Sequence, residues 1–111
     1  MKRGTILLTT LLVSAFSVSM ALAMNDSPVE RGKAHFNNPA FAGGKKSCNA
    51  CHPSGRGLEQ AGTKTIFHIM GKKQNSLEEA INVCIVNANR GHAIDVNSQE
   101  MQDMVSYIKS L

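Results

Sequence analysis

The segment Cys48-Asn49-Ala50-Cys51-His52 constrains the fold more than any other part of the sequence. Two cysteines stand three positions apart, and a histidine follows the second one directly. This C-x-x-C-H spacing is typical of covalent haem attachment, because both thiols can reach the vinyl groups of one macrocycle while the imidazole ligates the iron. The motif predicts one haem c with thioether bonds to Cys48 and Cys51 and with His52 as the proximal iron ligand.

Two other kinds of site use closely spaced cysteines. A redox dithiol needs no histidine and normally opens a helix in a βαβ setting, and this sequence has no alternating strand pattern. A zinc site needs a second Cys or His pair at short spacing, and none follows. Haem is also favoured by the small core that this chain can build. The 111 residues include no Trp and one Tyr, so a buried macrocycle would supply apolar area that the side chains lack.

The first residues are typical of a secretory signal peptide. Two basic residues precede an apolar run over residues 6–20, which ends in the small-residue sequence Ala21-Leu22-Ala23. An N-terminal membrane anchor is the alternative, but the run is short and rich in hydroxyl groups for a spanning helix. We expect residues 1–23 to be removed and residues 24–111 to form one haem domain. Such a leader predicts a periplasmic or secreted bacterial protein with no membrane anchor after cleavage.

The charge balance is mildly basic, with a formal net charge of +4 for the whole chain. Two of these charges belong to the predicted signal peptide, and the remaining excess is too small and too scattered for a nucleic-acid-binding protein. Six basic residues flank the haem motif and could form a docking rim for an acidic redox partner, although such residues are more often simply a solvated face. These residues are Lys45, Lys46, Arg56, Lys64, Lys72 and Lys73.

Three helices are predicted, which gives an all-α fold. Capping boxes at Ser27 and Ser76 indicate helices over residues 27 to about 37 and from residue 76 to about Ala88. A third helix is expected from about Ser98, with Asn97 as its cap. Its apolar stripe consists of Met101, Met104, Val105, Ile108 and Leu111. Residues 39–64 are rich in glycine and proline and predict a loop, and the short apolar stretch over residues 65–70 fits either a helix or a strand.

Cys84 is the cysteine that haem attachment does not use, and it lies on the apolar face of the second predicted helix. One interpretation is a small buried hydrophobic residue, which is a common fate of free cysteine. The other is a thiolate bound to iron, which would explain both its burial and its protection from oxidation. The residues alone leave both open.

The chain resembles the small single-haem c-type cytochromes over residues 27–111. Gly32 and Phe36 match the first-helix pair of that family, and Tyr107 with Ile108 matches its last-helix pair. The resemblance implies a three-helix cytochrome c-like domain wrapped around one haem. The family usually places a methionine ligand in the loop before the last helix, but the loop over residues 89–95 contains none.

A closer resemblance is to the haem domains of sulfur-oxidising cytochromes, namely thiosulfate dehydrogenases and the catalytic subunit of the Sox complex. It rests on residues 80–84, 89–91 and 95–101. Those domains bind haem through His and Cys, which implies that Cys84 is the distal iron ligand, with His92 as the alternative. Those enzymes use two haem domains or a partner subunit, whereas this chain has one haem motif.

The remaining ligand-type side chains lack such support. Met101 and Met104 lie on the apolar face of the last predicted helix and are expected in the core, and Met70 is a weaker example of the same case. His35 and His68 have no ligand-like context, and we expect both to be partly exposed.

The sequence favours a periplasmic one-electron carrier that works with redox partner proteins over an enzyme, and whether the protein is also an enzyme stays open. The alternative is an enzyme or enzyme subunit that oxidises inorganic sulfur compounds such as thiosulfate. A third class is a haem-based sensor, which would require a distal ligand that leaves readily. No catalytic acid, base or nucleophile beside the haem motif is evident in the sequence.

Overall fold

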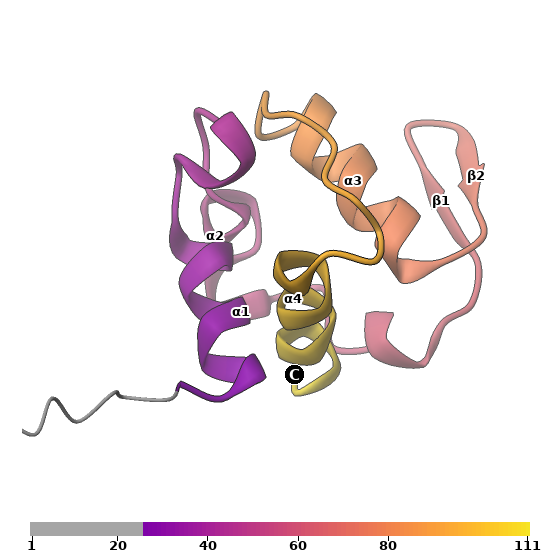
Figure 1. The fold of residues 1–111 in the computed structure, drawn as a ribbon. Helices are drawn as coiled ribbons and strands as arrows, with labels where there is room; N and C mark the ends of the chain where they lie inside the picture. The colour runs from indigo at the N-terminus through magenta and orange to yellow at the C-terminus, as the bar shows by residue number, and fades with distance from the viewer. Residues whose placement is uncertain (1–25) are drawn as a thin grey trace, which may run out of the picture.

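A computed structural model describes residues 26–111, so the predicted signal peptide over residues 1–23 lies outside the described residues. Figure 1 shows a helical domain with one small hairpin. The helices are α1 (Pro28–Asn37), α2 (Cys48–Cys51), α3 (Leu77–Asn87) and α4 (Gln99–Lys109), and the strands are β1 (Phe67–Ile69) and β2 (Lys72–Gln74). Short 3-10 turns connect them at Phe41–Gly43, Pro53–Gly55 and Ala61–Thr63. The three longer helices confirm the predicted helical fold.

Helices α1 and α4 cross closely and form one side of the core. Ser27 and Glu30 make the predicted capping box at the start of α1. Gly32 is buried at the crossing, where the α4 backbone leaves no room for a side chain. One turn further on, the rings of Phe36 and Tyr107 meet edge to face, with their centroids 5.1 Å apart.

A salt bridge also joins the two helices. Arg31 Nε and Nη2 donate to the two carboxylate oxygens of Asp103 at 2.8 and 2.9 Å, and Gln99 Nε2 donates to the same carboxylate at 2.9 Å. Asp103 is 1% exposed, so this two-pronged bond stabilises a carboxylate that would otherwise be costly to bury. The hydrogen bond from Arg31 lowers the pKa of Asp103.

Helix α4 differs from the prediction at both ends. Its N-cap is Ser98, whose Oγ accepts a hydrogen bond from the Met101 N–H at 3.2 Å, so the predicted cap at Asn97 was wrong by one residue. The helix ends at Lys109, and Leu111 beyond it is 36% exposed rather than part of the buried stripe. The other four stripe residues are buried as predicted.

Residues 65–70, whose apolar pattern fits either a helix or a strand, include β1 of an antiparallel hairpin. Phe67 pairs with Gln74 and Ile69 pairs with Lys72. Met70 and Gly71 form the two-residue turn, and both have positive φ angles of 53° and 74°. Since such primed turns match the twist of a hairpin, these two residues explain why the chain reverses here.

Helix α3 carries Cys84 and begins at the predicted Ser76 cap, whose Oγ accepts from the Glu79 N–H. Its buried face packs against the hairpin and α4. Ala88, the predicted end of this helix, is exposed and forms its C-cap. Asn82 exchanges two hydrogen bonds with the backbone of Ile94, at 2.8 and 2.9 Å, and so holds the loop before α4 against α3.

Candidate haem site

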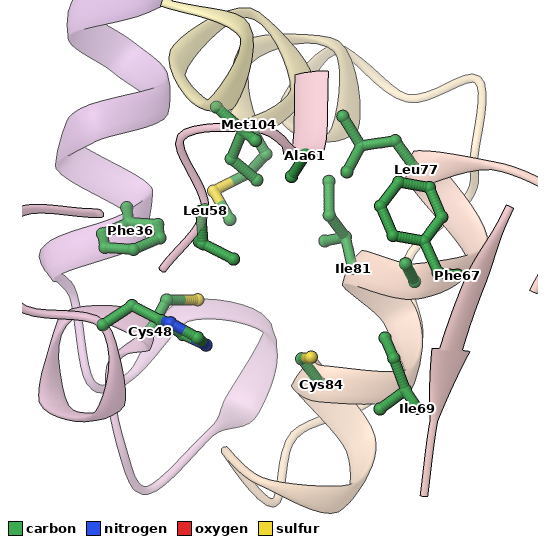
Figure 2. Close-up of a pocket in the computed structure, with 13 residues that line it drawn as sticks. Phe36, Cys48, Leu58, Ala61, Phe67, Ile69, Leu77, Ile81, Cys84 and Met104 are labelled. Carbon is green, nitrogen blue, oxygen red and sulfur yellow. The ribbon is translucent and has the colours of Figure 1, made fainter. Parts of the chain in front are cut away.

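A cavity opens between the α1–α4 pair, helix α3 and the hairpin (Figure 2). Apart from His52 and two cysteine sulfurs, the walls are apolar. The larger lining side chains are Phe36, Leu58, Phe67, Ile69, Leu77, Ile81, Met104 and Ile108.

The C-x-x-C-H motif forms a single helical turn, α2, at one side of this cavity. Ser47 caps the turn by accepting a hydrogen bond from the Ala50 N–H at 3.2 Å. The backbone N–H of His52 donates to the Cys48 carbonyl at 2.9 Å, which closes the turn. Cys48 is half-buried and lines the cavity, whereas Cys51 is exposed beside it.

Hydrogen bonds fix the orientation of the His52 ring. Nδ1 lies 2.9 Å from the carbonyl oxygen of Arg56. Because a carbonyl only accepts hydrogen bonds, Nδ1 carries the proton and the Nε2 lone pair remains available for a metal. A turn at Ser54, which has a φ of 52°, brings the Arg56 carbonyl back to the His52 ring. The backbone N–H of Ser54 donates to Asn49 Oδ1 at 2.8 Å and so holds this turn.

Cys84 lines the same cavity from α3. In Figure 2 its sulfur points into the cavity, across from Cys48 on the other wall. Burial raises the pKa of the Cys84 thiol, and the nearby Cys48 and Cys51 raise it further. A thiolate at this position therefore needs a nearby positive charge, which a metal ion supplies.

The alternative distal ligand, His92, does not line the cavity. Its side chain is exposed, and its ring lies beside Gly43. The backbone N–H of His92 donates to the Ala42 carbonyl at 2.8 Å, and the residue does not line the cavity. The structure thus places Cys48, His52 and Cys84 around one cavity and leaves His92 outside it.

The other ligand-type residues lie where their packing explains them. Met101 and Met104 are fully buried as predicted, and Met104 also lines the cavity. Met70 is 73% exposed at the hairpin turn, so it is not a core residue. His35 is half-buried against the Phe41 ring, with a centroid distance of 4.6 Å, and His68 is exposed on β1.

Within residues 26–111 no cluster of three or more His, Cys, Asp or Glu could hold a metal ion.

Asn89 is a site residue that the motif analysis did not identify as functional. Its side-chain Nδ2 donates to Cys48 Sγ at 3.3 Å, and the residue is buried. The two residues are far apart in the chain and meet only through the tertiary fold, so no local pattern could have indicated the contact. Burial raises the pKa of the Cys48 thiol, and the hydrogen bond from Asn89 opposes this effect.

These residues fit a covalently bound haem. The apolar walls suit a haem macrocycle, which has to be shielded from water. The Nε2 of His52 is free to ligate iron, and the sulfur of Cys48 lies in the wall that carries the attachment motif. The fold and the site together define a c-type cytochrome domain.

Comparison with protein families identifies the particular type. Residues 31–111 match the family model described as the SoxA/TsdA cytochrome c domain. The chain therefore belongs to this family, and a cytochrome c domain implies covalently bound haem c. The predicted resemblance to sulfur-oxidising cytochromes is confirmed.

Comparison with solved structures finds a similar fold. The crystal structure of SoxXA from P. pantotrophus aligns with a TM-score of 0.53 and 28% sequence identity, covering 73% of this chain. The alignment covers 31% of that chain, so this protein spans under a third of it. A sequence search of curated proteins gave no match. Within residues 26–111 no helix has the length and apolar character that crossing a bilayer requires.

Proposed function

We propose that this protein is an exported one-electron carrier with a single haem, attached through Cys48 and Cys51 and ligated by His52 and Cys84. The observation that carries the proposal is that His52 and Cys84 line one apolar cavity together with Cys48. A histidine and a cysteine from two separate elements are thus available to ligate one iron within the same site.

A haem in this cavity supplies one-electron chemistry through its ferric and ferrous states. The chain sets which state is favoured. A Cys84 thiolate would offset the positive charge of the oxidised site, and the reduced site would then carry one negative charge without a partner. Because the walls are apolar, that charge is poorly solvated, so the oxidised form is stabilised and the reduction potential is low.

The chemistry of the lining supports a carrier. The cavity walls contain no carboxylate, hydroxyl or ammonium group, so apart from the thiols of Cys48 and Cys84 they offer no acid or base beyond His52, whose Nδ1 is already bonded to Arg56. Electron transfer needs none of these groups. It needs a haem edge near the surface, and the exposed Cys51 marks where attachment would bring that edge close to solvent.

The surface around the motif suits an acidic redox partner. The six basic residues named above are all exposed, and two of them, Lys45 and Lys46, directly precede the haem-binding turn. Long-range attraction between this rim and an acidic surface would speed encounter. Electron transfer to an acidic partner should therefore slow as ionic strength rises, with a smaller effect in a Lys45→Gln, Lys46→Gln variant.

The proposal is tested by intact mass and by a reductive titration of the protein made in a host that attaches haem c. We expect the mass of residues 24–111 plus one haem and a single one-electron step. A bare polypeptide mass would exclude haem attachment, and more than one electron per chain would exclude a monohaem carrier.

A second candidate function is an enzyme or enzyme subunit that oxidises inorganic sulfur compounds, which the family match favours. In that case Cys84, or the iron beside it, handles a sulfur anion. Turnover of thiosulfate or tetrathionate by the purified holoprotein, with an artificial electron acceptor, distinguishes the two. A carrier accepts electrons from a reductant but shows no thiosulfate-dependent turnover.

A further inference from the structure

Asn89 follows helix α3 and makes an unusual side-chain contact. It is 5% exposed, and its Nδ2 donates to the sulfur of Cys48 at 3.3 Å. Buried amides normally find oxygen acceptors, because sulfur accepts hydrogen bonds only weakly. The contribution of such a weak hydrogen bond to folding stability therefore does not by itself explain why the Asn89 amide is buried against the Cys48 sulfur.

The backbone of Asn89 is also held on both sides. Its N–H donates to the carbonyl of Cys84 at 3.0 Å, and its carbonyl accepts from the Lys45 N–H at 2.7 Å and the Lys46 N–H at 3.4 Å. One residue therefore contacts the end of the helix that carries Cys84, the segment that leads into α2, and the sulfur of Cys48.

The surrounding turn keeps this arrangement rigid. Arg90 has a φ of 58°, and the Gly91 N–H donates to the Ile85 carbonyl at 2.8 Å, which reverses the chain directly after Asn89. A side chain on Gly91 would stand 2.8 Å from the carbonyl oxygen of Ala42, so the two loops are in close contact here. The position of the Asn89 amide is thus fixed by its neighbours.

We propose that Asn89 is a positioning residue that holds the sulfur of Cys48 and raises the reduction potential of the haem attached there. A thioether sulfur keeps lone pairs that accept a hydrogen bond. An N–H donor at that sulfur withdraws electron density from the attached macrocycle and so favours the reduced state, as outer hydrogen bonds do at other redox centres. The inference rests on covalent attachment at Cys48, as proposed above, but it does not require Cys84 to be the distal ligand.

The test compares Asn89→Leu, which keeps the size of the side chain but removes the donor, with the matched control Asn87→Leu. Asn87 lies at the end of the same helix, is exposed, and bonds only to the Val83 carbonyl through its side chain. In holoproteins of equal haem content, Asn89→Leu should lower the reduction potential and Asn87→Leu should leave it unchanged. An unchanged potential in Asn89→Leu overturns the proposal.

A second measurement uses the unaltered ferrous holoprotein and so does not depend on whether Asn89→Leu folds. The Asn89 side-chain amide protons should exchange with solvent at least tenfold more slowly than those of Asn87. Exchange of both amides at the same rate overturns the proposal. Intact mass of the unaltered protein separates this inference from the proposed function. A mass without haem refutes both, whereas a mass with one haem together with an unchanged potential in Asn89→Leu refutes only this inference.

Discussion

Gly32 on α1 lies directly against the backbone of Asp103 on α4, so closely that a Cβ on Gly32 would stand 2.0 Å from the Asp103 carbonyl oxygen. The same substituent would also meet the Asp103 carbonyl carbon at 2.6 Å. Since neither atom belongs to a movable side chain, the two helices could accept a larger residue only by moving apart.

Gly32→Ala should therefore destabilise the holoprotein. Overpacking costs about 1–3 kcal/mol, and a clash with backbone atoms belongs at the upper end of that range, so after the roughly 1 kcal/mol that alanine gains in helix propensity we expect a net loss of up to about 2 kcal/mol in the free energy of unfolding. The measurement is urea denaturation followed by circular dichroism. Lys33→Ala, exposed on the same helix, is the control and should stay within about 0.5 kcal/mol.

The salt bridge between Arg31 and Asp103 should make stability depend on pH. The hydrogen bond from Arg31 lowers the pKa of Asp103 in the folded protein, so the unfolded chain binds a proton more readily than the folded one as the pH falls. The stabilisation is complete above the pKa of an unfolded aspartate, about 3.9, and is lost as the pH falls through the lower folded value.

Asp103→Asn removes this contribution. Denaturation across the acid range should show that the stability difference between the wild type and Asp103→Asn shrinks as the pH falls below about 4. A difference that stays constant from neutral pH to pH 2 would mean that the carboxylate charge contributes nothing. Asp95→Asn, at an exposed loop aspartate, serves as the control.

Much of this helical fold follows from local patterns. The capping box at Ser27, the cap at Ser76 and the apolar spacing of α3 and α4 predicted the three longer helices, because each signal is contained within one or two turns. At Ser76 only half of the predicted box forms, since the Glu79 carboxylate accepts from the Asn75 N–H instead of the cap residue. The hairpin was missed for a local reason too. Its strands have three residues each, and methionine stands at position 70 where a turn of this type usually shows Asn or Asp, so the pattern lacked its usual signal.

The candidate site was only partly predictable. The motif predicted Cys48 and His52, helical spacing placed Cys84 on the apolar face of its helix, and all three line the cavity. His92 was a reasonable alternative by chain position, but the turn at Arg90 directs the chain to Gly43 instead of the cavity. The hydrogen bonds of Asn89 and the Arg56 carbonyl depend on the tertiary fold or on backbone geometry, which no residue pattern encodes.

The cavity predicts that the haem-free chain is unstable. An empty apolar cavity costs about 24 cal/mol per Å³, so the roughly 90 Å³ of empty space in this cavity corresponds to about 2 kcal/mol, a large part of the stability of a small domain. Cys48→Ala with Cys51→Ala should give a chain without a cooperative thermal transition. A transition close to that of the holoprotein would show that the side chains alone form a sufficient core.

Substitution of Cys84 should change the reduction potential. Cys84→Met replaces an anionic ligand with a neutral thioether, which favours the ferrous state, so the potential should rise on the order of 100 mV, or about 2.3 kcal/mol for one electron. Potentiometric titration measures this shift. His92→Ala is the matched control and should leave the potential unchanged, because His92 does not line the cavity.

The most direct test of the account is an electron paramagnetic resonance spectrum of the ferric protein, recorded for the wild type, Cys84→Ser and His92→Ala. We predict a low-spin signal typical of imidazole and thiolate ligation, retained in His92→Ala and replaced in Cys84→Ser by a high-spin signal or by that of another ligand. A wild-type spectrum typical of two imidazoles or of imidazole and thioether would contradict the account, as would a Cys84→Ser spectrum identical to that of the wild type.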